Sequence, residues 1–299
     1  MSLIESALDK LRRGEAGTDG RKAATRVVGA TPAVRGAPEV GPVMSTPEVA
    51  RRRFAVDSAS LRAAGYLPEE GMERRFADHY RRVKRPLIER ALAGTSDMRL
   101  IVISSALPGD GKTFTSFNLA LSVARERDVS VLLVDADVAR ARVSEVLGLR
   151  KEPGLLDALT DESVDVESLI LGTDIRGLEI LPAGRFIESS TELIASGRMS
   201  QIALRMTAHN PRRLVLFDSA PLLVSSEARV LCRIPGQIVL VVRAGTTPRR
   251  AIQDAVAQID KQKLQGLVVN QVRGATGEGY YGYGTYSGEA EKPLGERSG

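Results

Sequence analysis

A glycine-rich turn that carries a lysine and a threonine is the part of this 299-residue chain best suited to chemistry. It follows the apolar run at 100–103 and reads PGDGKT at 108–113. Glycines let backbone N–H groups turn inward around a polyphosphate, and the start of a helix adds partial positive charge. Lys112 is placed to reach β- and γ-phosphates, and the Thr113 hydroxyl to bind Mg²⁺. The stretch therefore predicts a phosphate-binding loop.

The loop departs from the pattern G-x-x-x-x-G-K-[ST] at one position, because Ala106 stands where the first glycine is expected. Gly111, Lys112 and Thr113 keep their places. A turn between a strand and a helix can carry GDGK by chance. The prediction therefore depends on support from other parts of the chain.

Three aspartates at the ends of apolar runs give that support. Asp135 and Asp137 follow the run at 129–134, and Asp218 follows the run at 214–217. One carboxylate can hold Mg²⁺ or its waters, and another can orient or deprotonate a nucleophile. Together with GDGKT, the aspartates predict Mg²⁺-ATP binding, with phosphoryl transfer that rests on positioning and charge stabilisation.

The elements that position these residues alternate between apolar strands and helical segments from Arg99 onward. Strands are expected at 100–103, 129–134, 178–181, 214–217, 237–242 and 264–270, and helices after the loop, at 191–209 and at 248–262. This rhythm indicates a mostly parallel sheet flanked by helices. Ligands of such sheets bind beyond the carboxyl ends of the strands, where the loop, the aspartates and Asn270 all fall. The expected fold class is α/β, of the P-loop NTPase type.

Composition divides the chain into four parts. Residues 1–70 are predicted to hold a short amphipathic helix, at 2–13, and a flexible linker rich in glycine, alanine and proline. Residues 71–95 form a basic helical segment, and 96–273 form the ATP-binding domain. Residues 274–299 are a tail too rich in glycine to pack, yet it holds four of the six tyrosines.

The basic segment, expected to bend or restart near Pro86, has three readings. It could pack a face made of Phe76, Tyr80 and Val83 on the domain and leave its charges in solvent. It could instead pair with acidic groups of a neighbouring subunit and drive oligomerisation. A nucleic-acid surface is the weakest reading, since no recognised binding motif accompanies the charge.

The remaining composition restricts the possible functions. The single cysteine, Cys232, lies in an apolar stretch, which excludes an intramolecular disulfide and favours a reducing compartment. His79 and His209 are isolated, so no zinc site or Ser-His-Asp set can be assembled. We expect no signal peptide, and the longest apolar runs are too short to span a bilayer. A net charge of +5 suits acidic partners such as nucleotides.

Three stretches resemble the Walker A, Walker A′ and Walker B motifs of the bacterial tyrosine kinases of capsule and exopolysaccharide systems. They read SSALPGDGKTFTSFNLA, VLLVDADVARARV and LVLFDSAPLL, and a tyrosine-rich C-terminus follows them. The similarity runs from 78 to 286. The stretches SLIESALDKL and HYRRVKRPL resemble the exosortase (PEP-CTERM)-associated subgroup. That family belongs to the MinD/ParA-like branch of P-loop proteins.

The resemblance implies a protein-tyrosine autokinase that uses ATP and Mg²⁺ and phosphorylates its own C-terminal tyrosines. It implies a ring-like homo-oligomer, a membrane-spanning polysaccharide co-polymerase (chain-length regulator) and a tyrosine phosphatase as partners, and no nucleic acid. The expected location is cytoplasmic, at the inner membrane through the partner, where the kinase would regulate exopolysaccharide polymerisation and export.

The resemblance also assigns roles to residues. The catalytic residues are Lys112, Asp135 and Asp137, with Asp135 the base or the group that orients the nucleophile. The metal-binding residues are Thr113, Asp137 and Asp218. The ATP-binding residues are Pro108, Gly109, Asp110, Gly111, Lys112, Thr113, Phe114, Arg243 and Asn270, the last two near the adenine. The phosphoacceptors are Tyr280, Tyr281, Tyr283 and Tyr286.

The chain departs from the family pattern at three places. Walker B continues as DSAP at 218–221, where DSPP is common, and Walker A′ continues as VARA at 138–141, without the usual basic pair and proline. The family's Glu-x-x-Arg-x-x-Arg oligomerisation motif aligns with Asp78, Arg81 and Lys84, and a lysine lacks the bidentate geometry of arginine. The last departure weakens the prediction of ring assembly.

Two other functions fit the same motifs. One is a MinD/ParA-like ATPase that positions a partner, and the other is a nucleotide-binding scaffold that regulates a polysaccharide machine. Positioning ATPases usually carry a second lysine early in the loop, whereas this chain has Leu107 and Pro108 there. That difference and the tyrosine-rich tail favour the kinase.

Overall fold

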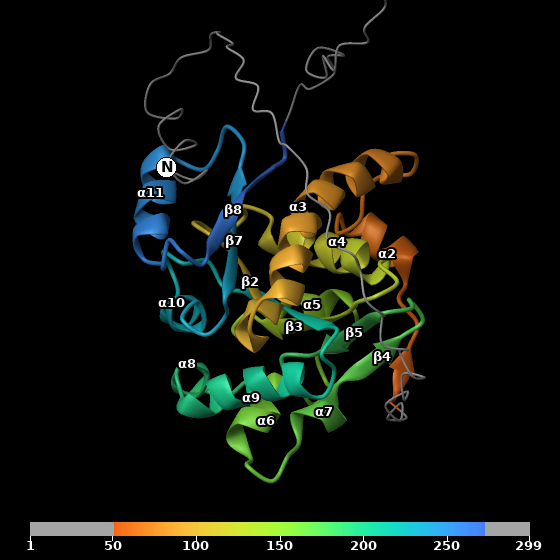
Figure 1. The fold of residues 1–299 in the computed structure, drawn as a ribbon, viewed down its shortest axis with the longest axis vertical. Coiled ribbons are helices and arrows are strands. Elements are labelled where there is room, and N and C mark those ends of the chain that lie inside the picture. Colours follow the sequence, from red (N-terminus) through yellow and green to blue (C-terminus); the bar gives the residue numbers. More distant parts are fainter. Residues whose placement is uncertain (1–50, 273–299) are drawn as a thin grey trace, which may run out of the picture.

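The computed structural model describes residues 51–272 (Figure 1). The helix predicted at 2–13, most of the predicted linker and the tyrosine-rich tail lie outside the described residues. None of the helices within 51–272 has the length and apolarity needed to cross a bilayer.

A mixed sheet of eight strands forms the centre of the described part, in the order β1-β4-β5-β3-β6-β2-β7-β8. The strands are β1 (Arg53–Phe54), β2 (Leu100–Ser105), β3 (Ser130–Ala136), β4 (Leu171–Thr173), β5 (Leu178–Leu181), β6 (Arg213–Ser219), β7 (Gln237–Arg243) and β8 (Leu264–Asn270). All neighbours pair in parallel except β4 and β5, which are antiparallel. The mostly parallel α/β fold predicted from the sequence is therefore confirmed.

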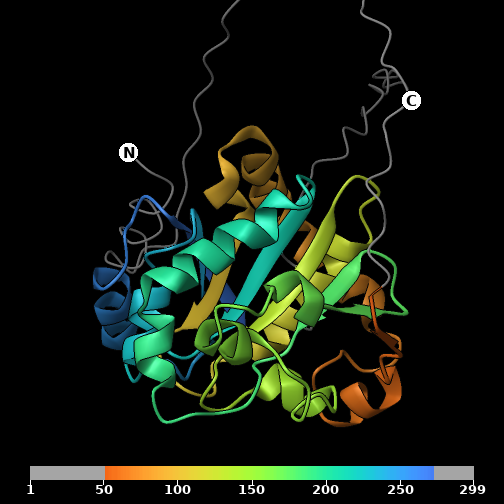
Figure 2. The same cartoon turned by 90° about the horizontal axis from the view of Figure 1, so that it is seen from below.

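Helices cover both faces of this sheet (Figures 1 and 2). They are α2 (Ser58–Ala63), α3 (Glu73–Ala93), α4 (Lys112–Ala124), α5 (Arg142–Val146), α6 (Leu155–Thr160), α7 (Val166–Leu169), α8 (Ser190–Ile194), α9 (Gly197–Ala208), α10 (Ser226–Leu231) and α11 (Arg249–Ala257), with a 3₁₀ turn at Ser96–Arg99. The helix predicted at 191–209 is divided into α8 and α9, and α11 ends before the predicted 262.

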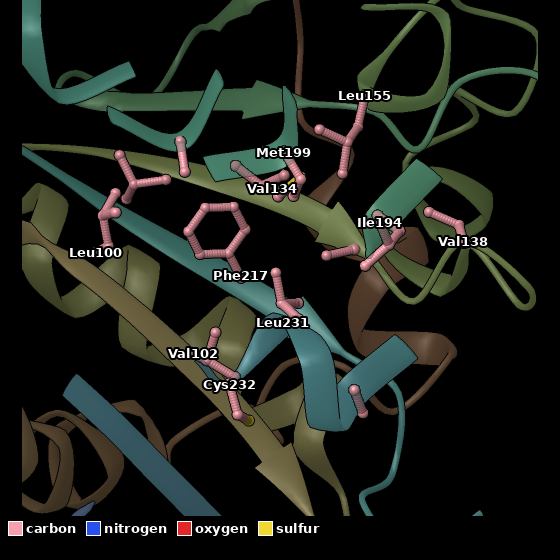
Figure 3. Packing of buried hydrophobic residues seen from close by; sticks show 14 of the residues in the cluster. Leu100, Val102, Val134, Val138, Leu155, Ile194, Met199, Phe217, Leu231 and Cys232 are labelled. Atoms are coloured by element: carbon pink, nitrogen blue, oxygen red, sulfur yellow. The ribbon is translucent and has the colours of Figure 1, made fainter. Parts of the chain in front are cut away.

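The core lies in two layers because side chains alternate along each strand. Leu100 and Val102 of β2 join the cluster beneath α6, α8, α9 and α10, where Phe217 packs at the centre (Figure 3). Ile101 and Ile103 point to the other face and join the cluster with α3 and α4. Burial on both faces explains why the central strands are almost entirely apolar.

Part of the predicted linker is structured. Residues 51–70 form β1 and α2, and Leu61 of α2 is buried in the core. Arg53 of β1 pairs with Gly172 of β4 at the edge of the sheet. A strand of two residues has no visible period in the sequence, which is why the polar composition of this stretch suggested a linker.

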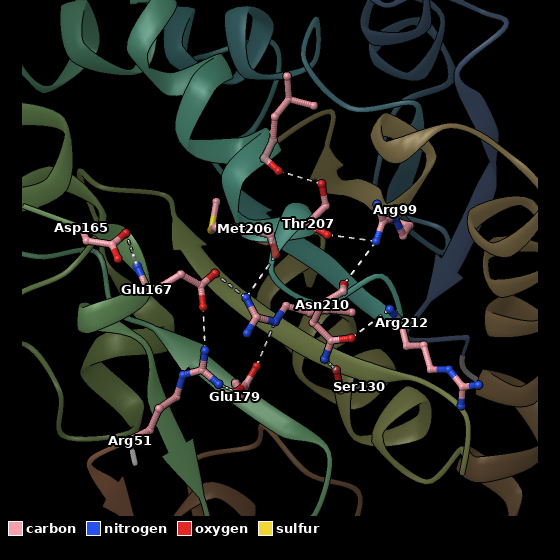
Figure 4. A network of polar contacts seen from close by, with 12 residues as sticks. Arg51, Arg99, Ser130, Asp165, Glu167, Glu179, Met206, Thr207, Asn210 and Arg212 are labelled. Carbon is pink, nitrogen blue, oxygen red and sulfur yellow. Dashed lines mark hydrogen bonds and ion pairs between the residues drawn. The ribbon is translucent and has the colours of Figure 1, made fainter. Parts of the chain in front are cut away.

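A closed network of two arginines and two glutamates ties the start of the described chain to the domain (Figure 4). Arg51 pairs with Glu167 at 2.6 Å and also with Glu179. Arg213 pairs with the same two glutamates at 2.6 and 3.1 Å and donates to the carbonyl of Met206. Arg213 and Glu167 are buried, and buried charges are tolerated when they are paired. Through its pairs with the two glutamates, Arg51 attaches the start of the described chain to the core.

Helix α3 runs without interruption through Pro86 and packs against α4. Tyr80 is buried, and Phe76 and Val83 are partly buried in the same cluster. The apolar face predicted from the sequence therefore does pack on the domain.

Lys84 of α3 points inward, which corrects its expected place among the oligomerisation charges. It is buried, it donates to the carbonyl of Ser122 at 2.6 Å, and it pairs with Glu126 at 2.7 Å. Asp78 and Arg81 remain exposed and pair with each other at 3.0 Å. Position 84 is four residues after the buried Tyr80, so it falls on the inner face of the helix.

Candidate nucleotide-binding site

The acidic strand ends meet at one edge of the sheet, as predicted. Asp135 of β3 and Asp218 of β6 are register partners on neighbouring parallel strands, and both are fully buried. Strand β2, which leads into the glycine-rich turn, lies on the other side of β6. The topology therefore brings the loop and the carboxylates together.

Two glycines shape the loop between β2 and α4. Gly109 and Gly111 have φ angles of 86° and 94°, a left-handed conformation that favours glycine. A Cβ on Gly111 would lie 1.9 Å from Nδ2 of Asn270, whereas one on Gly109 would meet nothing within 4 Å. Ala106 has no positive φ and is fully buried, so alanine fits where the motif expects glycine.

Lys112, the first residue of α4, is held by the carboxylate of Asp137. Its Nζ lies 2.6 Å from Oδ2 of Asp137, and both side chains are buried. Burial lowers the pKa of Lys112, but the negative charges of Asp218 and Asp137 outweigh that effect and the pKa is raised. The ammonium therefore stays protonated and available to an anion.

Two hydroxyls of α4 hold the carboxylate of Asp218. Thr113 donates to Oδ2 at 2.8 Å, and Ser116 donates to Oδ1 at 2.9 Å. Burial raises the pKa of Asp218, although these hydrogen bonds and Lys112 oppose the shift. Ser116 was not predicted from the sequence, although its spacing of three from Thr113 places both on one face of the helix.

Asp135, near the end of β3, is held by Ser144. Its Oδ2 accepts hydrogen bonds from the N–H and the hydroxyl of Ser144, both at 2.7 Å. Its Oδ1 is buried and has no hydrogen-bond partner among the described residues. Burial and the neighbouring charge of Asp218 raise the pKa of Asp135 to about 7.

Asp110 fastens the loop to the segment after β7 and to the end of β8. Its carboxylate accepts from the N–H of Leu107 at 3.0 Å and from the hydroxyl of Thr247 at 2.6 Å. Asn270, at the end of β8, donates to the carbonyl of Asp110 at 3.1 Å. Asn270 is thus at the loop, as predicted, while Thr247 was missed because its partner is distant in the sequence.

Arg243 opposes Asn270 across β7 and β8. It lines a cavity of about 360 Å³ together with Ala244, Gly245, Thr246, Gln271 and Val272. A second cavity, of about 630 Å³, lies between α2, α3 and the later turns of α4, away from the acidic strand ends. Of these two cavities, the first is the nearer to the loop, because Asn270, the register partner of Arg243, donates to Asp110.

The remaining predicted ATP-binding residues differ in how they are used. Pro108 is exposed at the loop. Phe114 packs its ring edge-on against Phe76 of α3, with the ring centroids 6.0 Å apart. The Phe114 side chain is thus engaged by α3, and its backbone, in the first turn of α4, is the part that remains near the loop.

The donor set fits Mg²⁺ that is completed by a nucleotide. Thr113, Asp137 and Asp218 offer hard oxygen atoms, which Mg²⁺ prefers. Within residues 51–272, no group of three or more His, Cys, Asp or Glu could hold a metal ion by itself. Mg²⁺ is usually held by one or two carboxylates and by substrate phosphates, so these residues suit that role.

The arrangement defines a nucleotide-binding domain of the P-loop class, because the lysine, the hydroxyl and the acidic strand ends converge where a polyphosphate would lie. The sequence model of the AAA domain family matches residues 98–263, more than half of the chain.

Tyrosine-protein kinase YwqD of Bacillus subtilis is 30% identical over 190 residues, which cover 63% of this chain and 78% of that protein. The chain belongs to this family of bacterial tyrosine-protein kinases.

Other relatives agree with this assignment. Tyrosine-protein kinase wzc of Salmonella typhimurium is 28% identical over 195 residues, which cover 64% of this chain and 27% of that protein. This chain thus spans about a quarter of the length of some relatives. The kinase domain of Escherichia coli tyrosine kinase ETK matches with a TM-score of 0.53 at 28% identity, over 62% of this chain and 72% of that one. The homology to tyrosine-protein kinases implies that ATP is used.

Proposed function

We propose that the chain is an ATP-dependent protein-tyrosine autokinase that acts on its own C-terminal cluster. The observation that carries this proposal is the convergence of Lys112, Asp135, Asp137 and Asp218 at one sheet edge of a domain homologous to tyrosine kinases. The phosphoacceptors would be Tyr280, Tyr281, Tyr283 and Tyr286.

Different residues of the site would bind different parts of the two substrates. Lys112 would bind the β- and γ-phosphates. The adenine would lie near Arg243 and Asn270, at the ends of β7 and β8. Mg²⁺, held by Thr113, Asp137 and Asp218, would neutralise charge on the phosphates. Asp135 would orient the tyrosine hydroxyl or take its proton as the phenol oxygen bonds to the γ-phosphorus and the bond to the leaving ADP breaks.

The position of the last described residue supports the choice of acceptor. Val272 lines the cavity beside the loop, and Tyr280 follows about eight residues later. An extended chain covers at most about 3.5 Å per residue, so roughly 28 Å separates the first tyrosine from that cavity at most. The first tyrosine is therefore tethered close to the site of its own chain.

We further propose that the chain belongs to the exosortase-associated subgroup and acts in exopolysaccharide production. We also propose that a membrane-spanning co-polymerase holds it at the inner membrane. A tyrosine phosphatase would reverse the modification. A ring-like oligomer would use the exposed basic side of 71–95, with Asp78 and Arg81 but without the inward Lys84.

The direct test compares the whole chain with Lys112→Met after incubation with Mg²⁺-ATP. We expect phosphotyrosine in the whole chain and none in Lys112→Met, while Lys151→Met, a change at an exposed lysine, labels normally. ADP release without phosphotyrosine would support the positioning ATPase instead. Nucleotide binding without either product would support the regulatory scaffold.

A further inference from the structure

The two oxygens of Asp135 have different surroundings. Oδ2 receives two hydrogen bonds from Ser144, and Oδ1 receives none from the described residues although it is buried. A carboxylate can accept at both oxygens, and a buried acceptor left alone is costly. Oδ1 is thus the oxygen that remains for a group that is not part of the described chain.

The hydroxyl oxygen of Ser144 is also held by a backbone group from another segment of the chain. The N–H of Ala183 donates to Ser144 Oγ at 3.0 Å. The oxygen accepts that hydrogen bond, and its single proton is donated to Oδ2 of Asp135. Ser144 is only 1% exposed, so its contact with Asp135 is held inside the fold.

A tight turn brings Ser144 back to the end of β3. The N–H groups of Arg140 and Ala141 both donate to the carbonyl of Asp137, at 3.0 and 2.6 Å. Ala141 has a φ of 46°, a left-handed conformation that an alanine rarely adopts. The chain therefore reverses directly after Asp137, and the first turn of α5 lies against Asp135.

We infer that Ser144 is a positioning residue, which holds the Asp135 carboxylate by Oδ2 so that Oδ1 accepts the hydrogen bond of the attacking tyrosine hydroxyl. This inference rests on the proposed kinase function. Ser144 touches neither substrate and takes part in no bond that forms or breaks. Ala183, two residues after the end of β5, completes the support from a third segment of the chain.

The test uses the whole chain and measures both ADP release and phosphotyrosine. Ser144→Ala should lower kcat by about 10- to 100-fold, as expected when a hydrogen bond to a charged group is lost. KM for ATP should stay within about twofold, because the phosphate contacts of Lys112 are untouched. Ser144→Thr, which keeps the hydroxyl, should recover most of the rate. Ser122→Ala, at another buried serine, should have no effect.

A double-variant cycle separates positioning from simple support of the fold. On the background of Asp135→Asn, adding Ser144→Ala should change kcat by less than about twofold, since the carboxylate it positions is gone. An equal loss on both backgrounds, or a rise in KM with kcat unchanged, would overturn the inference.

The same experiment distinguishes failure of the kinase proposal. If the wild-type chain releases ADP without phosphotyrosine, the kinase proposal fails and the inference about the tyrosine hydroxyl fails with it. If the wild-type chain does label its tyrosines but Ser144→Ala labels at the same rate, the kinase proposal stands and the inference alone is wrong.

Discussion

The Nζ of Lys112 lies 2.6 Å from Oδ2 of Asp137, and these side chains are only 10% and 2% exposed. The pair joins the start of α4 to the end of β3, two strands away from β2 in the sheet. Asp137 places a negative charge beside the lysine, which raises the pKa of Lys112 and fixes its ammonium group near the end of β3.

We predict that Lys112→Met lowers the free energy of unfolding by about 3 kcal/mol, because it leaves Asp137 buried without its partner. Adding Asp137→Asn should restore part of this loss, since the neutral amide needs no counter-charge. Urea unfolding of the two single variants and the double variant measures the coupling. Losses that simply add would show that the pair contributes nothing as a pair.

Gly111→Ala should impair the loop far more than Gly109→Ala. Both replacements strain a left-handed residue, but only the methyl group at Gly111 meets Nδ2 of Asn270. The amide would have to leave the carbonyl of Asp110, so nucleotide affinity should fall further. Adding Asn270→Ala to Gly111→Ala should remove the clash and bring the variant's thermal stability close to that of Gly109→Ala. Equal affinities for the two single variants, measured by calorimetry, would refute this account.

Thr247→Val should weaken nucleotide binding about tenfold, which corresponds to about 1.4 kcal/mol. The change removes the 2.6 Å hydrogen bond to the buried Asp110 and frees the loop from the segment after β7. Thr247→Ser keeps the hydroxyl and serves as the matched control. If Thr247→Val binds a nucleotide as tightly as Thr247→Ser does, Asp110 is not the fastening point of the loop.

Cys232 should resist alkylation in the folded chain at about pH 8. Burial raises the pKa of its thiol to about 12, so the neutral form is favoured when the chain is folded. This contribution to stability is complete below the unfolded pKa and is lost as the pH rises from there toward 12. Iodoacetamide should therefore label the chain only in denaturing urea. Rapid labelling without urea would show that the thiol is accessible.

The strands were predictable where an apolar run is bounded by turns. The runs at 178–181 and 264–270 coincide with β5 and β8 to the residue. Strand β1 was missed because two residues carry no period, and its place depends on Arg51 pairing with two distant glutamates. A contact between residues more than a hundred positions apart leaves no local signal in one sequence.

The candidate site was predictable to the same extent. Lys112, Asp135 and Asp218 follow from strand ends and loop spacing, because a parallel sheet gathers such positions at one edge. Ser144 and Thr247 were not predicted, since serine and threonine are common and their partners lie on other segments. Whether each site residue performs its assigned role stays a prediction.

The most direct test of the account is the intact mass of the whole chain after incubation with Mg²⁺-ATP. The comparison is a variant in which Tyr280, Tyr281, Tyr283 and Tyr286 are all phenylalanine. The account predicts that several phosphate groups are added to the whole chain and none to the variant. An equal number of phosphates on both chains would contradict it, and so would ADP release without any phosphate on the whole chain.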